Sequence, residues 1–440
     1  MRGRWRWLGV AMVAVAGVGV AVAPVINGWQ AETAWRDGAP RVSDALSASL
    51  GGQARVEVVD YQRGLYSARV TSRIELPAPA LAGNASATIE LIADHRVRHG
   101  WRGVSIDGHL EPVGPLAGPF RRLGGDDGTL SIEGELGHDA QSLQLRSEPL
   151  AGPLDPSGSV TLEIAPFALE ARTTDTGRHW VTALDWSGFA LREPDTQAKL
   201  SLGGLRLDSD LRLVAGQPVQ GIWAGDAALA LEESVLRPGT DAAITLERME
   251  LTTQSHVSEE SLIDGDMMLD WQGLSLPGLA GMRGRIGAVF ERLDPEALLR
   301  LSEQAAPGRR SGVSGSEWRE TLAALAAEGP LASLTSLRVE SAAGAGLTGS
   351  AELRIKPDMA AQLRAAADAM ALWQSLRLDA SLSVDTALIE ALPAEQRLWV
   401  EQAKAFGVLR RTDNGWDVAM SIDDGSLSVH GESGWWGPSG

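Results

Sequence analysis

The 440-residue sequence contains no cysteine. This absence excludes disulfide bonds, thiolate metal sites, a cysteine nucleophile and lipidation of an N-terminal cysteine. It does not fix the redox compartment, because a large domain needs no disulfides even where the environment is oxidising.

The motifs of several enzyme classes are also missing. The sequence has no HExxH zinc motif, no GxSxG nucleophile elbow and no glycine-rich phosphate loop followed by lysine. The paired carboxylates Asp126-Asp127 and Asp423-Asp424 lie in turn sequences, where turn geometry alone favours Asp. We therefore predict a protein that is not an enzyme, with no catalytic, metal-binding or cofactor-binding residues and no cofactor.

The charge balance argues against nucleic-acid binding. The chain has 39 basic and 57 acidic residues, a net charge of -18. Nucleic acids and anionic surfaces repel a body with this excess of carboxylates.

The N-terminus carries the clearest targeting signal. Leu8–Ile26 contains no charged residue, and about 20 apolar residues of helix span a bilayer. Arg2, Arg4 and Arg6 precede it, so the positive-inside rule predicts a cytoplasmic N-terminus and a periplasmic body. We predict an uncleaved, single-pass anchor in the inner membrane.

A cleavable signal peptide is the alternative interpretation of this segment. Ala21-Val22-Ala23 fits the small-x-small pattern of a cleavage site. Pro24 would then follow the cut, and the segment is longer than the usual signal core. Both features favour the anchor.

The body is predicted to be α+β and mostly antiparallel β. After residues 1–27 (stub and anchor) and a helical linker at 28–52, interrupted near Gly38 and Pro40, apolar and polar residues alternate over 53–291. Turn sequences such as DPSG and RPGTD separate the alternating runs. This pattern indicates a long β-meander that forms a curved sheet.

The last third, 292–432, is predicted to mix helices and strands. Asp294 and Ser316 are expected to cap two helices, and Gly329 to end the second. Asn414-Gly415 and Asp424-Gly425 are typical hairpin turns. Residues 433–440 are predicted to form a disordered tail.

The only two tyrosines of the chain flank the stretch QRGL in YQRGLY. We predict a hairpin here, with Gly64 at positive φ and with Tyr61 and Tyr66 as a cross-strand aromatic pair. No nucleophile or acid pair accompanies this loop, so we predict a structural role for it.

Two histidines form the best alternative site. His95 and His99 share one face of a predicted strand, and His109 is near in sequence. Imidazoles on one face can bind a divalent ion or serve a hydrolase. The alternative is a pair of histidines on the polar face of a strand, and the sequence offers no compact carboxylate set to complete a site.

Four tryptophans lie in the strand region: Trp180, Trp186, Trp223 and Trp271. Exposed together, they would stack on sugars or line an acyl groove. The favoured interpretation is that they are core aromatics in a chain poor in Phe and Tyr.

Three segments resemble the YdgA-like family of bacterial envelope proteins. YQRGLYSARV is similar to the family's N-terminal signature through Tyr61, Arg63, Gly64, Tyr66 and Ser67. HRVRHG (95–100) is similar to its histidine-glycine strand, with Trp101 in place of the usual proline. The closing segment around His430-Gly431 resembles the family's C-terminal strands. The resemblance implies an anchored periplasmic protein that can form dimers, with no established enzymatic activity.

Three functions follow as hypotheses. The first is a membrane-anchored binding or structural protein of the envelope. Its apolar strand faces must be covered by a second sheet, by helices or by a ligand, and faces that exceed what the chain itself can cover would suit a hydrophobic or lipid-binding β groove. The second is a self-associating scaffold that pairs through strand edges, and hence a homodimer. The third is a hydrolase using His95 or His99.

Overall fold

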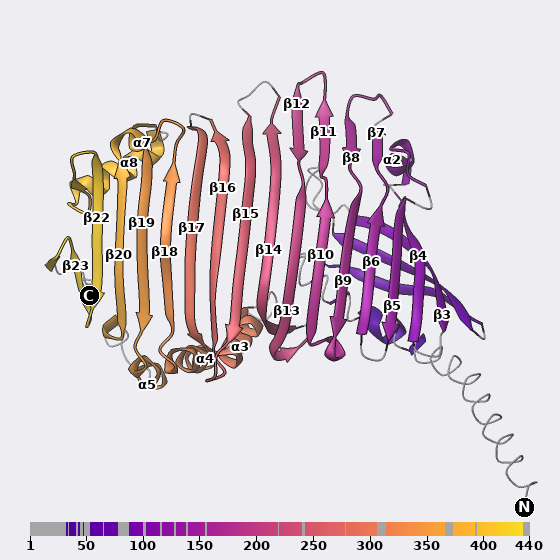
Figure 1. The fold of residues 1–440 in the computed structure, drawn as a ribbon, viewed down its shortest axis with the longest axis horizontal. Helices are drawn as coiled ribbons and strands as arrows, with labels where there is room; N and C mark the ends of the chain where they lie inside the picture. The colour runs from indigo at the N-terminus through magenta and orange to yellow at the C-terminus, as the bar shows by residue number, and fades with distance from the viewer. Residues whose placement is uncertain are drawn as a thin grey trace, which may run out of the picture. The chain divides into compact units, whose positions relative to one another are not determined.

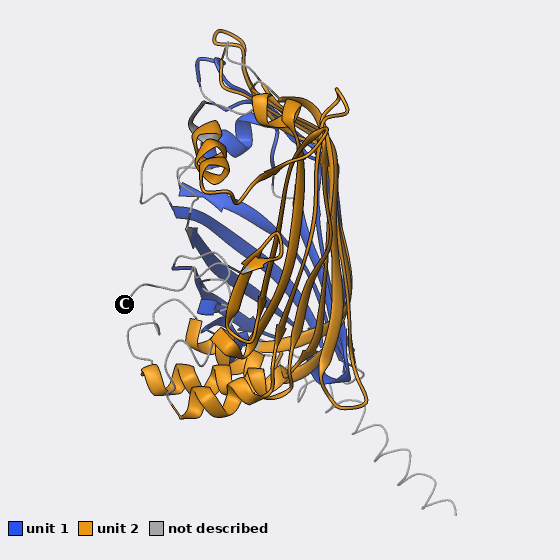
Figure 2. Ribbon diagram, turned by 90° about the vertical axis from the view of Figure 1, so that its left-hand side faces the viewer, with its two compact units in different colours: residues 1–191 blue, residues 192–440 orange. Residues whose placement is uncertain are grey.

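A computed structural model of the protein describes residues 32–433, apart from 34, 41–42, 45–46, 48–52, 65, 78–87, 100–102, 115–116, 127–128, 138–139, 155, 219, 240–242, 278, 306–313, 366–372 and 392–393. The chain forms two compact units, residues 1–191 (unit 1) and 192–440 (unit 2) (Figure 2). The predicted anchor Leu8–Ile26, Trp101 and residues 434–440 of the tail lie outside the described residues. No helix among the described residues is long and apolar enough to cross a bilayer.

Unit 1 is built from antiparallel strands, as the alternating sequence predicts. Its labelled elements are β1 (Arg55–Arg63), β2 (Ser67–Pro77), β3 (Thr88–His99), β4 (Gly103–Val113), α2 (Ala117–Arg122), β5 (Leu130–Gly137), β6 (Ala140–Ser147), β7 (Leu150–Pro153), β8 (Thr161–Ile164), β9 (Phe167–Thr174), η2 (Asp175–Gly177), β10 (His179–Trp186) and the start of β11 (Phe189–Glu193). Pairing runs β1–β2–β3–β4–β5–β6–β9–β10, and β7 pairs with β8.

A helical segment before β1 covers one face of this sheet. Glu32, Thr33, Trp35–Pro40, Ser43, Asp44 and Ser47 are helical, so the predicted break near Gly38 and Pro40 is wrong. Trp35 packs on a core of Ala68, Val70, Val97 and Val104, in which Val70 and Val97 are completely buried. Tertiary packing of this apolar face outweighs the low helix propensity of Gly and Pro.

Two serines of the same helical segment bind the edge of β1. The Ser43 Oγ accepts from the Val56 N–H at 2.7 Å, and the Ser47 Oγ accepts from the Ala54 N–H at 2.8 Å. The unpaired backbone groups of an edge strand are a template for pairing with another chain. The two serine hydroxyls therefore already satisfy the backbone N–H groups of Ala54 and Val56.

The hairpin between the two tyrosines is confirmed, but its predicted details are wrong. Arg63 pairs with Ala68, and Tyr61 lies opposite Val70 rather than Tyr66, which sits in the loop with 54% of its surface exposed. Gly64 is not at positive φ. Its N–H bonds the Ser67 carbonyl at 2.7 Å, and a Cβ on Gly64 would lie 2.8 Å from that oxygen. The loop requires glycine because of this close backbone approach.

Replacing Gly64 by alanine should lower the free energy of unfolding by about 1–3 kcal/mol, the usual range for local backbone strain. Gly38→Ala is the matched control, because a Cβ at Gly38 would have nothing within 4 Å. In a helix this second change should stabilise the protein by about 0.5–1 kcal/mol. Chemical denaturation of both variants measures the difference, and equal effects would contradict the steric explanation.

Unit 2 continues as a meander of longer strands (Figure 1). Its strands are β12 (Ala198–Leu202), β13 (Leu205–Gln217), β14 (Gln220–Arg237), β15 (Ile244–Val257), β16 (Ile263–Leu276), β17 (Leu279–Leu293), β18 (Leu331–Glu340), β19 (Gly346–Ile355), β20 (Leu376–Asp385), β21 (Arg410–Arg411), β22 (Gly415–Asp423), β23 (Ser426–Val429) and β24 (Glu432–Ser433). Each of β13 to β19 pairs antiparallel with the next strand, and β20 pairs with β22. The mostly antiparallel β fold is confirmed, and its pairing continues past residue 291.

The helices of unit 2 occupy the connections between strands. They are α3 (Pro295–Ala305), α4 (Gly315–Ala327), α5 (Asp358–Arg364), α7 (Thr386–Ala391) and α8 (Ala394–Ala405). Asp294 caps α3 as predicted, since its Oδ1 accepts from the N–H groups of Glu296 and Ala297. The cap of α4 is Ser314 and not Ser316, because Ser314 and Glu317 form a reciprocal capping box. Gly329 follows the helix at φ +65°, as expected.

The two C-terminal hairpin predictions differ in outcome. Asp424 and Gly425 have φ values of +48° and +77° and join β22 to β23, as predicted for a two-residue turn. At the other turn, the Thr412 N–H bonds the Gly415 carbonyl at 2.9 Å. The loop residues are therefore Asp413 and Asn414, one position earlier than predicted.

Candidate functional site

One row of apolar side chains crosses the whole meander of unit 2. In an antiparallel sheet, register partners point to the same face. Successive registers from β13 to β22 align the residues that we call the leucine ladder: Leu207, Leu229, Leu251, Leu269, Ile286, Leu337, Leu382 and Val418, with Gly349 at the β19 position. Its length is about 38 Å at the usual strand spacing of about 4.8 Å.

A second row runs beside the ladder, two residues further along each strand. This flanking row consists of Leu205, Leu231, Met249, Trp271, Val339, Leu347, Val384 and Trp416, with Gly284 at the β17 position. Every side chain of the two rows is only partly buried. Phe290 and Leu353, on the same face, are 38% and 36% exposed. The described residues of unit 2 therefore give this apolar face less cover than a folded core normally has.

Helices pack on this face only near its ends. Figure 2 shows the helices of unit 2 on one side of its sheet, near the two ends of the strands. At one end, Ile355 and Met359 pack against the buried Ala323, Ala326, Ala360 and Leu363 of α4 and α5. At the other end, the Lys404 ammonium of α8 lies 4.4 Å from the ring centroid of Trp416, a cation–π contact. The middle of the ladder has no comparable core contact among the described residues.

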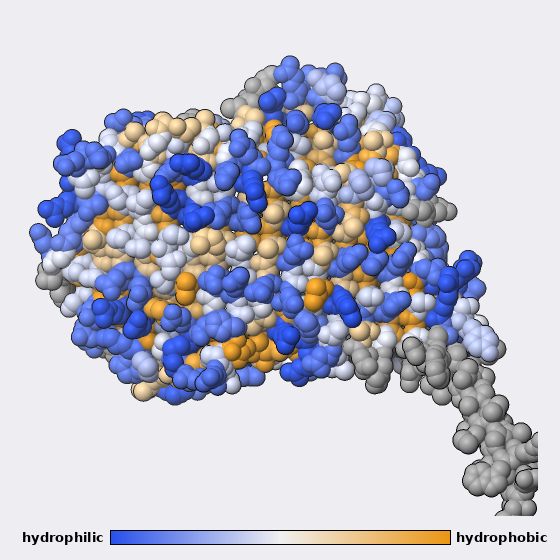
Figure 3. Space-filling model, viewed as in Figure 1, coloured by the Kyte–Doolittle hydropathy of each residue, from blue (hydrophilic) through white to orange (hydrophobic). Residues whose placement is uncertain are grey.

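The opposite face of the same sheet carries many charged and polar side chains, with apolar side chains between them (Figure 3). Oppositely charged side chains pair there, for example Arg285 with Asp270 of the neighbouring strand at 2.7 Å and Arg248 with Glu250 of the same strand at 2.9 Å. Exposed pairs of this kind contribute little stability individually. They make this face compatible with water, so the two faces of unit 2 differ sharply in polarity.

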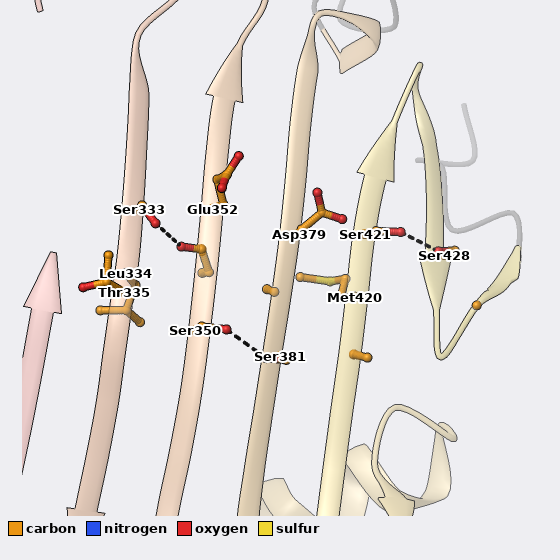
Figure 4. Close-up of a pocket in the computed structure, with 14 residues that line it drawn as sticks. Ser333, Leu334, Thr335, Ser350, Glu352, Asp379, Ser381, Met420, Ser421 and Ser428 are labelled. Carbon is orange, nitrogen blue, oxygen red and sulfur yellow. Dashed lines mark hydrogen bonds between the residues drawn. The ribbon is translucent and has the colours of Figure 1, made fainter. Parts of the chain in front are cut away.

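A shallow hollow of about 460 Å³ lies across β18, β19, β20, β22 and β23 (Figure 4). Its serines bond one another, Ser350 with Ser381 at 3.0 Å and Ser421 with Ser428 at 2.7 Å. Glu352 and Asp379 are register partners in it, and no histidine or lysine lines it. A serine nucleophile needs an adjacent base. The hollow therefore lacks the arrangement of a serine hydrolase.

The two histidines identified in the sequence lie in the core of unit 1. His95 and His99 share a face of β3 as predicted, but that face is buried, with 6% and 4% of each residue exposed. The polar-face alternative is therefore wrong. The Trp35 ring lies 5.2 Å from the His95 ring at an interplanar angle of 57°. Neither the His95 Nδ1 nor either nitrogen of His99 has a hydrogen-bond partner among the described residues.

Burial determines the charge state of both rings. Desolvation lowers the pKa of His95 to about 4, and His109 adds to the fall while Asp94 opposes it. Desolvation also lowers the pKa of His99, assisted by the positive charge of Arg63. Both imidazoles are therefore neutral at pH 7.

The histidine cluster does not assemble a metal or hydrolase site within the described residues. No group of three or more His, Asp or Glu side chains is close enough to hold a metal ion there. His109 pairs with Asp94, and His95 pairs with Gly108, so alternation places His109 on the other face of the sheet. Gly108 is required beside His95, because a Cβ there would lie 2.8 Å from the His95 Nδ1.

The lowered pKa predicts acid sensitivity. The unfolded chain takes up a proton near pH 6.5, whereas folded His95 does so near pH 4. Stability should therefore fall as the pH drops from 6.5 towards 4, by up to about 3 kcal/mol. His95→Gln should flatten this dependence, and His256→Gln, at an exposed histidine, should leave it unchanged. Urea unfolding at several pH values tests this; parallel profiles for H95Q and the unmodified protein would contradict it.

The tryptophans have separate roles. The Trp180 Nε1–H donates to the Gly177 carbonyl, and the Trp186 Nε1–H donates to the Ala165 carbonyl, each at 3.1 Å. Both side chains are only partly buried, and neither belongs to a buried core cluster of the described residues, so their interpretation as core aromatics stays a prediction. Trp271 differs, because it belongs to the flanking row and its ring lies over Gly284, where a Cβ would come within 2.0 Å of its Cζ2. Trp271 thus forms part of the apolar face.

The sequence predicts strands with one solvated and one apolar face, but not how the apolar residues of successive strands align. Leu334 and Leu337 are three residues apart, so simple alternation would place them on opposite faces. A register shift in β18 instead pairs Leu334 with Ala288 and Leu337 with Ile286, on one face. Such a shift is visible only in the structure.

Comparison with known proteins identifies a family but no activity. Residues 140–433 match the model of a family described as bacterial protein of unknown function (DUF945). No curated protein and no solved structure matches the chain. The family match covers the whole ladder.

Proposed function

The chain belongs to the bacterial family of unknown function DUF945, and on that premise we propose that it binds lipid hydrocarbon chains along the leucine ladder. The observation that carries this proposal is the partial exposure of every ladder side chain on a face about 38 Å long. Burying apolar area contributes roughly 25 cal/mol per Å², so a ligand that covers two such rows gains a large driving force.

The chemistry of the ladder favours hydrocarbon over peptide. The backbone N–H and C=O groups of its inner strands already pair with neighbouring strands on both sides. They offer no hydrogen bonds to a peptide laid on the face, and a peptide with unpaired backbone groups would lose several kcal/mol per group. An acyl chain has no such groups. Its length and lack of polarity match a narrow, continuous apolar strip.

The cellular setting in this proposal comes from the sequence. The charge-free segment Leu8–Ile26 would anchor the protein in the inner membrane, with the N-terminus in the cytoplasm and the body in the periplasm. The similarity of YQRGLYSARV to the YdgA-like envelope proteins supports a role in the cell envelope. The proposed role is binding, without catalysis.

The proposal predicts that the purified full-length protein carries lipid. Native mass spectrometry after detergent extraction should detect bound lipid, and Leu269→Glu should remove most of it. A carboxylate in the middle of the ladder would lose its hydration whenever an acyl chain covered it, which is costly. The same spectra report stoichiometry and retention of the anchor.

Thr348→Glu is the matched control. It adds the same charge to the opposite face, where Thr348 is exposed and pairs with Arg338. This variant should keep its lipid, and circular dichroism should show that both variants are folded. An unmodified protein without bound lipid, or equal loss in the two variants, would refute ladder binding.

Two alternatives stay as proposals. A self-associating scaffold would pair through the part of the β1 edge beyond Val56, because Ser43 and Ser47 do not bind there. Crosslinking in membranes that yields only monomer would refute this proposal. A hydrolase based on His95 or His99 has less support, because neither ring has a nucleophile among its described hydrogen-bond partners.

A further inference from the structure

Two basic side chains lie beside Trp416, where the flanking row of the leucine ladder ends. Arg411 of β21 is the register partner of Trp416 on the side away from β20. Register partners point to the same face, so Arg411 lies on the ladder face. Lys404 of α8 approaches the same ring, with its ammonium 4.4 Å from the ring centroid. The apolar strip therefore ends at a tryptophan that adjoins two basic residues.

Arg411 supplies the net positive charge at this end of the strip. The Lys404 ammonium also lies 2.7 Å from the Glu401 carboxylate, so these two charges largely cancel. Arg411 is exposed and forms no ion pair with the described residues. Its neighbour Arg410 differs, because the register partner of Arg410 is Asp417 on the opposite face of the sheet. A guanidinium without a carboxylate partner among the described residues is thus left beside the apolar strip.

A carboxylate occupies the same face further along the flanking row. Glu247 lies two residues before Met249 in β15, so alternation places both on the ladder face. The Glu247 side chain is exposed and lies over Gly273, where a Cβ would clash with it. An anionic group is repelled by Glu247 and attracted by Arg411. These charges therefore give a bound amphiphile a direction, with its anionic end at Trp416.

We propose that Arg411 binds the anionic headgroup of a lipid whose hydrocarbon chain lies on the leucine ladder. The ligand class is then an acyl lipid that carries a carboxylate or a phosphate. This inference rests on the proposed function, since it specifies which lipids the ladder binds. The planar guanidinium presents paired N–H donors that fit two oxygens of either group. Trp416 beside it offers an apolar surface to the methylene groups next to the headgroup.

The position of Arg411 favours an amphiphile over a soluble anion. An exposed guanidinium gains little from a separate carboxylate in water, because solvent and salt screen the pair. A ligand whose chain already lies on the ladder brings its anionic group to Arg411 without a second loss of translational freedom, as in multivalent binding. The apolar strip and the charge therefore reinforce each other only for a ligand that has both parts.

A pair of ligands that differ in charge tests the headgroup contact. The full-length protein, extracted in detergent, is titrated with palmitate or with methyl palmitate, and native mass spectrometry measures the bound fraction. The unmodified protein should prefer palmitate. Arg411→Gln should weaken palmitate binding about threefold to tenfold and leave methyl palmitate binding unchanged. Arg411→Lys keeps the charge but loses the paired donors, so it should retain part of the preference.

Arg410→Gln is the matched control, because it removes the same charge one residue away on the opposite face. This variant should bind both ligands as the unmodified protein does. Dipalmitoylphosphatidic acid and dipalmitoylglycerol form a second ligand pair, which differs by a phosphate instead of a carboxylate. A preference for the charged member in only one of the two pairs identifies which headgroup Arg411 binds.

Two results would overturn the headgroup proposal and leave ladder binding intact. One is equal affinity for the charged and the neutral member of both pairs. The other is an equal change in Arg411→Gln and Arg410→Gln, which would show a general effect of net charge. Ladder binding itself fails if neither the charged nor the neutral ligands bind. Leu269→Glu should weaken methyl palmitate as well as palmitate, because it acts on the hydrocarbon chain.

Discussion

The structure of unit 2 depends on strand register kept over successive antiparallel pairs. Because side chains alternate with a period of two, a slip of one residue in one strand would move its apolar set to the hydrophilic face. The meander has register irregularities in β13, β16, β17 and β18, yet the ladder residues remain on one face. The irregularity in β18 places Leu334, which is outside the ladder, on the same face as the ladder residue Leu337. Register therefore creates the continuous apolar strip on which the proposed function rests.

The two units differ in how far their helices cover an apolar face of the sheet. In unit 1 the helical segment before β1 lays Trp35 on the sheet, and Val70 and Val97 beneath it are completely buried. In unit 2 the helices hold only the ends of the corresponding face, at Ile355 and at Trp416. A chain that can cover one face with its own helix has the means to cover another. Among the described residues, the incomplete cover of this face in unit 2 is the observation on which the proposal of a hydrocarbon ligand rests.

How much could be predicted from the sequence depends on how local the signal is. Alternation predicted the antiparallel strands, and Asp294 and Asp424-Gly425 were found correctly because caps and tight turns are encoded within a few residues. The predictions for Ser316 and for Asn414-Gly415 missed by one or two positions for the same reason, since several adjacent residues can serve each turn. Tyr61 and Tyr66 do not pair because the loop begins at Gly64, which leaves Tyr66 outside the strand pairing.

The candidate sites show the limit of local information more clearly. The histidine spacing correctly placed His95 and His99 on one face, but whether that face is wet or buried depends on a helix about 60 residues earlier in the chain. The ladder requires nine strands in register, and no single strand reveals it. Its residues are ordinary leucines and valines, which any one strand uses to pack against a core. The ladder becomes a candidate site only because its aligned side chains are left partly exposed, and that exposure depends on the tertiary structure.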